Sequence, residues 1–544
     1  MGVLGLWTEL EPAAQKMILS QLARKNVNLT HNERGHPKIH DVMTVGIDMG
    51  TFMDECACAV HAAGIHHPFA SGPLRPFFFR LAKLLKIPAA FVFVFDGPHR
   101  PPKKRGVAVQ AQDELWWVED AKRIIEAFGF VAHQAPGEAE AELAHLNRWG
   151  RVDAVWTADS DSLVFGGQVI LRSMKANDKQ TKRLDECTVY MADNIGRTLG
   201  YDHGQLILYA LVSKGDYDDG LKGGGPVSAA EIARSSIGRD FSNVLAATPG
   251  NATPVLNGWR QRTLNTLHSS GRTLGINGHA KNALKDQIVS FPSINPLYCY
   301  RNPATSQSHP EYLPDSSNWS SIHQPDIGKL VDLCIQRLRW SRDRAKLLET
   351  FRNQIWEGTM LRLIFSKSCA WNDDGHPSFG TASRRLPVQT CSVLKTEAWN
   401  PTQKEECVRF GVYESDILSE MLTEEQRQVF EPVLNSKNPA VVARAWVPPE
   451  FIPQSMLALV GPSGTRMKRK HGAPSRALKK RRTLEGSVEG IPDGHSPVQA
   501  AQPSDGHSPV QAAQPSDGNI ARAPAVPVGD VIDLTVDVID LTVD

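Results

Sequence analysis

Residues 90–96 have the sequence Ala90-Phe91-Val92-Phe93-Val94-Phe95-Asp96, an apolar run that stops at a carboxylate. A short run of aromatic and β-branched residues is typical of a β-strand. Similar runs predict further strands at 44–47, 153–157 and 168–171. Helical spacing of apolar residues predicts helices between them, at 74–85, 113–128 and 138–148. This alternation predicts an α/β fold with a mostly parallel central sheet and flanking helices up to about residue 240.

Acidic side chains follow the predicted strands. Asp48, Asp96 and Asp159 stand where apolar runs stop. In open α/β sheets ligands bind beyond the carboxyl ends of the strands, so we expect these side chains to meet there. Four further acids complete the set: Glu138, Glu140, Asp161 and Asp216. Like charges a few ångströms apart raise each other's pKa, so such a cluster predicts bound cations.

Mg²⁺ suits this set, with Mn²⁺ as a substitute, because it prefers oxygen ligands and keeps several waters. Two such ions about 4 Å apart activate an attacking water and stabilise the leaving oxygen in phosphodiester hydrolysis. We therefore predict a two-metal nuclease. For any single Asp the alternative is a helix cap or a loop residue. Independent caps would not be expected at three strand ends together with a Glu pair and an Asp-x-Asp.

The composition is that of an ordinary soluble protein, with 22% charged and 41% hydrophobic residues among 544. The formal net charge of +1 averages a basic stretch, 466–482, against an acidic C-terminus. The eight cysteines form no CxxC pair, which argues against a zinc knuckle or a disulfide framework. The longest apolar run, 87–95, is too short to cross a bilayer, so we expect a soluble intracellular protein without membrane contact.

Three further parts are predicted beyond residue 240. Residues 241–370 have mostly helical spacing. Residues 385–452 mix short β-like pieces with a charged helix, which predicts a small separate α/β module. From about 460 to 544 the composition changes to Pro, Ser, Ala, Gly and charge, which cannot bury a core, so this tail should be disordered.

Several ordered motifs resemble the XPG family of structure-specific 5′ nucleases, to which the flap endonucleases belong. They are Met1-Gly2-Val3-Leu4-Gly5-Leu6-Trp7, Val94-Phe95-Asp96-Gly97, Ala135-Pro136-Gly137-Glu138-Ala139-Glu140-Ala141, Thr157-Ala158-Asp159-Ser160-Asp161-Ser162-Leu163 and Gly215-Asp216-Tyr217. Within the family, Leu10-Glu11-Pro12 and 74–80 are most similar to the Holliday-junction resolvase branch. The resemblance implies a PIN-like nuclease core over 1–240, with a helix-two-turn-helix at about 205–240, and a chromodomain-like identity for the module at 385–452.

The resemblance also implies roles for single residues. The metal-binding and catalytic carboxylates of the family correspond to Asp48, Asp96, Glu138, Glu140, Asp159, Asp161 and Asp216. On a regular helix Glu138 shares a face with Glu142 and not with Glu140, so Glu142 stays open as the alternative ligand. Gly2 is predicted to contact DNA.

A basic loop follows Asp96. Its members Arg100, Lys103, Lys104 and Arg105 are predicted to bind DNA. Lys103 falls where the family places a catalytic lysine, and a cation there would stabilise charge in the transition state. The alternative is a solvated loop that holds phosphate non-specifically. Only about ten residues separate Arg105 from the next predicted helix, so we expect the helical arch of flap endonucleases to be nearly absent and the site to be open to branched DNA.

The glycine-rich segment 220–225 resembles the helix-two-turn-helix, which binds one duplex strand with help from K⁺. Gly223 and Gly225 are predicted to let backbone amides approach phosphate closely. Gly224 and Pro226 depart from the usual apolar and basic residues, so lower duplex affinity is expected. Residues 1–240 offer no base-reading signature, and recognition is expected to follow DNA shape with strong salt dependence.

The tail carries two kinds of motif. Basic clusters at 468–470 and 479–482 predict a bipartite nuclear localisation signal, an import receptor as partner and a nuclear location; the alternative is non-specific nucleic-acid binding. Val-Ile-Asp-Leu-Thr-Val-Asp occurs twice, at 531–537 and 538–544, and resembles a SUMO-interacting motif that adds a strand to a partner's sheet. Two copies favour polymeric SUMO, and the alternative is an aggregation-prone strand. The predicted contacts are Val531, Ile532, Leu534, Val538, Ile539 and Leu541.

The leading hypothesis is a nuclear, Mg²⁺-dependent endonuclease that cuts 5′ flaps or Holliday junctions in DNA repair and recombination, leaving a 5′ phosphate. The resemblance implies monomers on flaps and paired subunits on four-way junctions. One alternative is a catalytically weak, branched-DNA-binding scaffold recruited by SUMO, which Gly224 and Pro226 favour and the intact acidic set disfavours. Another is an RNA-directed nuclease, which differs only in substrate.

Overall fold

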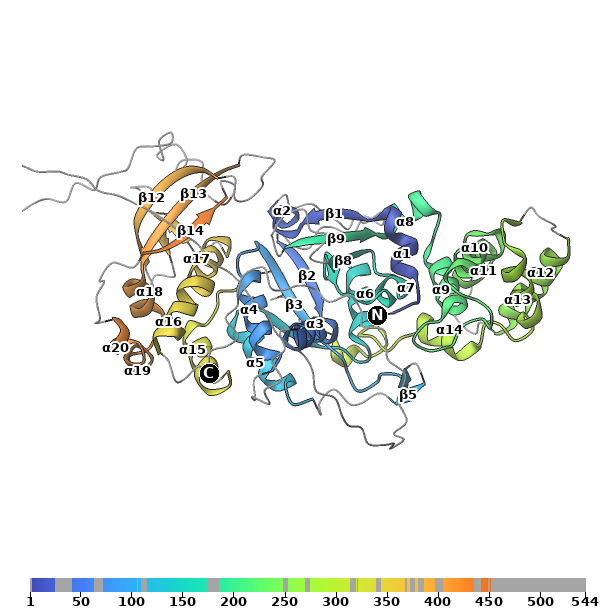
Figure 1. Ribbon diagram of the computed structural model, residues 1–544, viewed down its shortest axis with the longest axis horizontal. Helices are drawn as coiled ribbons and strands as arrows, with labels where there is room; N and C mark the ends of the chain where they lie inside the picture. The colour runs from blue at the N-terminus through green and yellow to red at the C-terminus, as the bar shows by residue number, and fades with distance from the viewer. Residues whose placement is uncertain are drawn as a thin grey trace, which may run out of the picture. The chain divides into compact units, whose positions relative to one another are not determined.

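Figure 1 shows the chain as a computed structural model. The structure describes residues 2–24, 42–62, 72–104, 106–108, 115–174, 185–247, 253–269, 274–313, 319, 321–338, 344–366, 369–371, 377–379, 386–396, 405–434, 442–448 and 451. Among these residues no helix is both long and apolar enough to cross a membrane.

The central sheet has seven strands in the order β1-β9-β8-β7-β2-β3-β6. Their bounds are β1 Gln15–Ile18, β2 Met43–Asp48, β3 Ala89–Phe95, β6 Val131–Gln134, β7 Ala154–Trp156, β8 Val169–Ser173 and β9 Glu186–Met191. The five strands from β8 to β6 pair in parallel, and β9 and β1 are added antiparallel at one edge. The predicted α/β fold with a mostly parallel sheet is confirmed.

The helices and short turns fill the intervals between the strands. Their bounds are α1 Leu6–Leu10, η1 Glu11–Ala13, α2 Leu19–Arg24, α3 Met49–Ala62, α4 Leu74–Leu84, α5 Val118–Ala127, α6 Ala139–Arg148, α7 Asp161–Val164, α8 Ala192–Leu199, α9 His203–Ser213, α10 Pro226–Arg234, α11 Ser236–Ala247, α12 Thr253–Ser269, α13 Gly278–Gln287, α14 Ile294–Arg301, η5 Pro310–Tyr312, α15 Ile327–Gln336, α16 Arg344–Thr350, η7 Phe351–Ile355, α17 Trp356–Phe365, α18 Glu414–Met421, α19 Glu424–Gln428 and α20 Glu431–Leu434.

Strand β3 shows why the sheet sits at the centre. All seven of its residues are buried. Successive side chains of a strand point to opposite faces, so the phenylalanines enter one core with α3, α4 and α5, while Val92 and Val94 enter the other with α6. On the neighbouring strand, a Cβ at Gly46 would lie 2.4 Å from Leu143 Cδ2, so glycine lets α6 pack closely on β2. Helices thus cover both faces, and the carboxyl ends of the strands stay open for the site.

Strands β1, β6 and β9 were not predicted. β6 ends in His133 and Gln134 and lies at one edge of the sheet, and β1 begins with the exposed Gln15 and Lys16 at the other. Edge strands bury less apolar surface, so their apolar pattern is weak. The helix predicted at 113–128 corresponds to α5, which begins later than predicted, at Val118.

The buried Arg362 joins helix α17 to the domain of the seven-stranded sheet. Its guanidinium donates hydrogen bonds to the backbone carbonyls of Leu84 (3.0 Å), Leu85 (3.2 Å) and Ala89 (2.9 Å). Burial lowers the pKa of Arg362 to about 9. These three carbonyls surround the end of α4 and the start of β3, so Arg362 fixes the C-terminal helices against the strand that leads to Asp96.

A second, antiparallel sheet follows α17 in the order β10-β11-β12-β13-β14. Its bounds are β10 Cys369–Trp371, β11 Pro377–Phe379, β12 Leu386–Thr396, β13 Glu405–Tyr413 and β14 Val442–Val447. Glu414, at the start of α18, accepts hydrogen bonds from Arg352 (2.6 Å) and Trp356 (2.9 Å). The strands and helix of this region therefore pack on α17 and the π-helical turn η7.

Candidate active site

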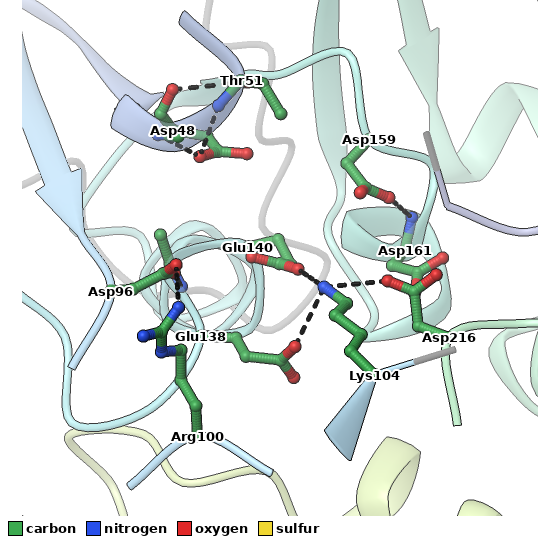
Figure 2. A network of polar contacts seen from close by, with 12 residues as sticks. Asp48, Thr51, Asp96, Arg100, Lys104, Glu138, Glu140, Asp159, Asp161 and Asp216 are labelled. Atoms are coloured by element: carbon green, nitrogen blue, oxygen red, sulfur yellow. Dashed lines mark hydrogen bonds and ion pairs between the residues drawn. The ribbon is translucent and has the colours of Figure 1, made fainter. Parts of the chain in front are cut away.

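The seven predicted carboxylates lie together at the carboxyl end of the parallel strands (Figure 2). Asp48 is the last residue of β2, Asp96 directly follows β3, and Asp159 follows β7. The other four stand at the start of α6, at the start of α7 and after α9: Glu138, Glu140, Asp161 and Asp216. All seven side chains are largely buried, although carboxylates are rarely buried without partners.

Lys104 supplies a positive charge at the centre of this cluster. Its Nζ lies 3.0 Å from Glu138 Oε1, 2.6 Å from Glu140 Oε1 and 2.8 Å from Asp216 Oδ2. These carboxylates raise the pKa of Lys104 well above its usual value, against the opposing effect of burial. Lys104 comes from the short hairpin of β4 (Lys103–Lys104) and β5 (Val107–Ala108). The structure therefore brings one lysine of the predicted basic loop into the acidic site.

The neighbouring Lys103 points elsewhere. It is exposed, because successive residues of a strand face opposite sides and Lys104 takes the side toward the carboxylates. Arg100, on the same loop, donates from Nη1 to Asp96 Oδ2 at 2.9 Å. Arg105 lies outside the described residues, as do the tail motifs predicted for import and for SUMO.

Hydrogen bonds orient the strand-end aspartates. Asp48 Oδ1 accepts from the backbone N–H groups of Gly50 (3.0 Å) and Thr51 (3.3 Å), and Asp48 Oδ2 accepts from Thr157 Oγ1 (2.9 Å). Asp96 Oδ1 accepts from the N–H of Ala139 at 2.8 Å. Each aspartate is thus tied to a neighbouring element, which fixes the distances between the strands' acidic ends.

Burial and the charges of neighbouring carboxylates raise the pKa values of five of these residues, Asp48, Asp96, Glu138, Asp159 and Asp161. Burial is the largest cause for Glu138, whose pKa rises to about 7, and for Asp159, whose pKa rises to about 6; the charge of Glu140 adds to both. The pKa of Asp48 and that of Asp161 are raised well above their usual range for the same reason. Such shifts mean that full ionisation of the cluster is unfavourable unless cations are bound.

The residues fit a hard divalent cation. Oxygens of Glu140, Asp159 and Asp216 all lie within 4.8 Å of one another. Both carboxylate oxygens of Asp161 are buried without a hydrogen-bond partner among the described residues. Mg²⁺ prefers such oxygen donors, and the Lys104 ammonium already shows that a cation is accommodated between them.

Glu140 and Glu142 differ clearly in their surroundings. Glu142 is fully buried, accepts from the Ser306 N–H at 2.7 Å and lies 3.2 Å from His133 Nε2; these contacts outweigh burial and lower its pKa. Glu138 is the N-cap of α6, with φ −78° and ψ 137°. Because Glu138 is extended and not helical, the regular-helix argument against its sharing a site with Glu140 does not apply, and both contact Lys104.

The N-terminal segment packs against the acids. Gly2 has φ +84°, and a Cβ there would lie 2.3 Å from Asp159 Oδ1 and 2.8 Å from Asp161 Oδ1. The backbone N–H of Val3 donates to Ser160 Oγ at 2.9 Å. Only glycine fits this close approach in this backbone conformation.

Two polar residues of the site were not singled out from the sequence. The Tyr217 hydroxyl donates to Glu138 Oε2, and Thr157 Oγ1 donates to Asp48 Oδ2. Burial, and after it the nearby Glu138 carboxylate, raise the pKa of Tyr217 well above its usual value, which keeps it a donor. Thr157 lies two residues before Asp159, and Tyr217 directly follows Asp216. This closeness to predicted site residues is the feature of the sequence that could have identified them.

The two unusual residues of the glycine-rich segment 220–226 have structural explanations. A Cβ at Gly224 would lie 2.7 Å from the carbonyl oxygens of Leu221 and Val212, so a side chain does not fit there. Pro226 is the first residue of α10, a position that suits proline. Gly225 precedes it, and the space where its Cβ would stand is open. The loop therefore presents backbone to its surroundings beside the start of a helix.

Comparisons with known proteins agree with the motifs. Residues 129–216 match the family described as the XPG I-region. The chain is 31% identical over 175 residues to a probable flap endonuclease 1 homolog of Danio rerio, covering 30% of this chain and 48% of the relative. It is 26% identical over 262 residues to the flap endonuclease GEN homolog 1 of Homo sapiens, covering 44% of this chain and 26% of the relative.

A solved structure matches more of the chain. It is that of the Holliday junction-resolving enzyme GEN1 in complex with product DNA and a Mg²⁺ ion, with a TM-score of 0.55 and 24% identity over 82% of this chain and 95% of that one. This likeness shows the fold. The chain spans about half or less of the length of the curated relatives that it matches. The predicted resemblance to the XPG and flap endonuclease family, and within it to the GEN branch, is confirmed by these matches.

Proposed function

We propose that the chain is a Mg²⁺-dependent, structure-selective DNA endonuclease that cuts branched DNA in repair and recombination. The convergence of seven carboxylates, six of them buried and Asp96 partly buried, at one end of the sheet carries this proposal. Buried like charges destabilise a fold, so a cluster of this size, in which the pKa values of Asp159 and Asp161 among others are raised, supports a functional site. The relatives named as flap endonucleases support the reaction type.

The proposed metal ligands are the seven carboxylates Asp48, Asp96, Glu138, Glu140, Asp159, Asp161 and Asp216. We place Glu140 and not Glu142 in the set, because Glu142 is already engaged by Ser306 and His133. When bound, two Mg²⁺ ions, or Mn²⁺ in their place, would supply an activated water and stabilise the leaving oxygen.

The protein's own cations would act on the phosphate. Lys104 lies among the carboxylates and Arg100 beside Asp96, so a phosphodiester that reaches the acids meets both. We infer that Lys104, in place of the predicted Lys103, stabilises the negative charge that develops during cleavage. Lys103 is exposed on the opposite side of β4 and is proposed to bind phosphate without taking part in the reaction.

The helix-two-turn-helix is proposed to hold the duplex. Gly223 and Gly225 expose backbone next to the N-terminus of α10, where N–H groups favour phosphate, and K⁺ would assist there. A GEN-1 structure described as binding potassium has a similar fold at 23% identity. Contacts of this kind are made with DNA phosphates and depend on the shape of the backbone, not on the base sequence. Because phosphate contacts weaken as salt concentration rises, cleavage should depend strongly on salt.

The proposed substrates are 5′ flaps and four-way junctions, cut to leave a 5′ phosphate. The described part of the loop after Asp96 folds into the β4–β5 hairpin, and residues 109–114 lie outside the described residues. A short loop favours an open site. The name of the GEN1 relative as a Holliday junction-resolving enzyme supports the junction, on which we propose that two subunits pair.

The remaining proposals concern partners and location. We propose nuclear import through the basic clusters of the tail and SUMO binding through its two C-terminal repeats. The antiparallel sheet β10–β14 with α18 is proposed to act as a chromodomain-like DNA-contacting module. No observation favours the scaffold alternative, because the departures at Gly224 and Pro226 have local structural reasons.

A substrate panel tests the proposed function. It contains 5′ flap, nicked and intact four-way junction, splayed-arm and linear duplex DNA, with RNA counterparts, in Mg²⁺ and in Mn²⁺. We expect cleavage of the branched DNA and none of the linear duplex. Cleavage of linear and branched DNA at equal rates would contradict structure selectivity, and cutting of the RNA counterparts alone would replace the proposed substrate.

A further inference from the structure

Two histidines and a glutamate meet outside the carboxylate cluster. His99 lies in the loop after β3, three residues beyond Asp96, whereas His309 and Glu311 stand at the beginning of η5. Each offers a possible ligand atom, and these atoms lie within 4.8 Å of one another. The two imidazole rings are stacked, with centroids 4.6 Å apart and planes inclined by 21°. None of the seven acids belongs to this group.

Backbone hydrogen bonds hold both segments in place. The N–H of His99 donates to the carbonyl of Pro136 at 2.9 Å, ahead of α6. The N–H of His309 donates to the carbonyl of Thr305 at 2.9 Å, which closes a turn. Main-chain groups therefore fix the backbone of both segments, and the three side chains already place their ligand atoms within 4.8 Å of one another.

The contacts of Ser308 prepare His309 as a ligand. Ser308 Oγ accepts from the Thr305 N–H (3.1 Å) and donates its single proton to the Thr305 carbonyl (3.0 Å). Its remaining contact, 3.0 Å to His309 Nδ1, is therefore made with Nδ1–H as the donor. A neutral imidazole protonated at Nδ1 presents the Nε2 lone pair, and such a second hydrogen bond is the usual way to orient a metal-binding histidine.

We propose that His99, His309 and Glu311 bind a zinc ion. Two imidazoles and one carboxylate are a ligand set that Zn²⁺ accepts, with a fourth, tetrahedral position left to water. Imidazole favours zinc over Mg²⁺, which prefers oxygen ligands, so this site and the carboxylate cluster select different ions.

The zinc ion would join two parts of the chain at the edge of the site. His99 is followed by Arg100, which pairs with Asp96 at 2.9 Å. The turn at 305–309 is anchored to α6, because the Ser306 N–H donates to Glu142 at 2.7 Å. Zinc would therefore fasten the loop that carries Arg100 to a turn already fixed on α6. This inference does not depend on the proposed nuclease activity, because zinc binding is measured without DNA.

The test is zinc binding by the full chain, in competition with a chromophoric zinc chelator and with excess Mg²⁺ to occupy the carboxylates. We expect His99→Ala and His309→Ala each to lose one zinc equivalent relative to wild type. Ser308→Ala should keep the site with about tenfold weaker affinity, because all three ligands remain while the hydrogen bond that orients His309 and the two that Ser308 Oγ makes with Thr305 are lost. His268→Ala, on the exposed side of α12, is the matched histidine control and should bind like wild type.

Further measurements separate this site from the carboxylate cluster. The double variant Asp159→Asn plus Asp161→Asn should retain the zinc equivalent that the histidine variants lose. Co²⁺ bound at the site should give the visible absorption of a four-coordinate ion, and the histidine variants should lack it. The proposal is overturned if both histidine variants bind as much zinc as wild type, or if the zinc disappears only from the aspartate variant.

Discussion

Lys104→Met should destabilise the metal-free protein, because Lys104 offsets the repulsion between the carboxylates of the acidic site. The substitution keeps an apolar stem and removes the ammonium that lies within 3.0 Å of three carboxylates. Removing one partner of a fully buried ion pair costs about 3–5 kcal/mol. The Lys104 side chain is 28% exposed, so solvent screens part of this effect. We expect the metal-free protein to lose about 2–3 kcal/mol of unfolding free energy, at or below the lower limit of that range because of the solvent screening.

The assay is urea unfolding followed by tryptophan fluorescence, in EDTA and in excess Mg²⁺. The loss should shrink in Mg²⁺, because a divalent ion neutralises the same carboxylates. Lys103→Met is the matched control: its side chain is exposed on the same two-residue strand, and we expect a change within about 0.5 kcal/mol in both solutions. The proposed electrostatic role of Lys104 is wrong if Lys104→Met has the wild-type unfolding free energy in EDTA, or if it loses the same amount in EDTA and in Mg²⁺.

Four other outcomes are expected. Lys104→Met should lower the cleavage rate about 10²-fold and Lys103→Met much less; equal losses would contradict the assignment. Gly2→Ala should lower cleavage at saturating Mg²⁺ about 10²-fold, since its Cβ displaces Asp159, and wild-type rates would argue against this packing. In EDTA, the melting temperature should fall as pH rises from about 4.5 to 7. The pKa of Glu138 is raised to about 7 in the folded state, so over this pH range the folded protein keeps the Glu138 proton and the unfolded chain loses it. A melting temperature that rises over this range would contradict this. Arg362→Met should cost about 3–5 kcal/mol in urea unfolding by orphaning buried carbonyls, and a loss under 1 kcal/mol would count against it.

The central strands were predictable because strands that are buried on both faces consist mostly of apolar residues. β2 and β3 are buried at every position, and apart from Thr44 and the terminal Asp48 of β2 their residues are apolar or glycine. The edge strands β1 and β6 are stabilised by pairing with neighbours that their own residues do not reveal. Which runs pair, and in what order, depends on contacts between distant segments.

The acidic site was predictable because parallel strands place their carboxyl ends at one edge of the sheet. The choice between Lys103 and Lys104 was not, because it depends on the register of β4 with β5, which pairs Lys103 with Ala108. The environments of Glu140 and Glu142 likewise depend on Ser306, a residue far along the chain. The meeting of His99 with His309 has the same origin, since no local pattern joins the two segments.

We propose above that the acidic cluster is the catalytic site of a branched-DNA nuclease. The most direct measurement compares wild type with the double variant Asp159→Asn plus Asp161→Asn, in cleavage of a four-way junction in Mg²⁺ and in binding to the same junction in EDTA. The variant should lose cleavage and bind the junction at least as tightly as wild type, because two negative charges near the phosphates are removed. Cleavage by the variant at the wild-type rate, or a wild-type protein that binds the junction and never cuts it, would contradict the claim.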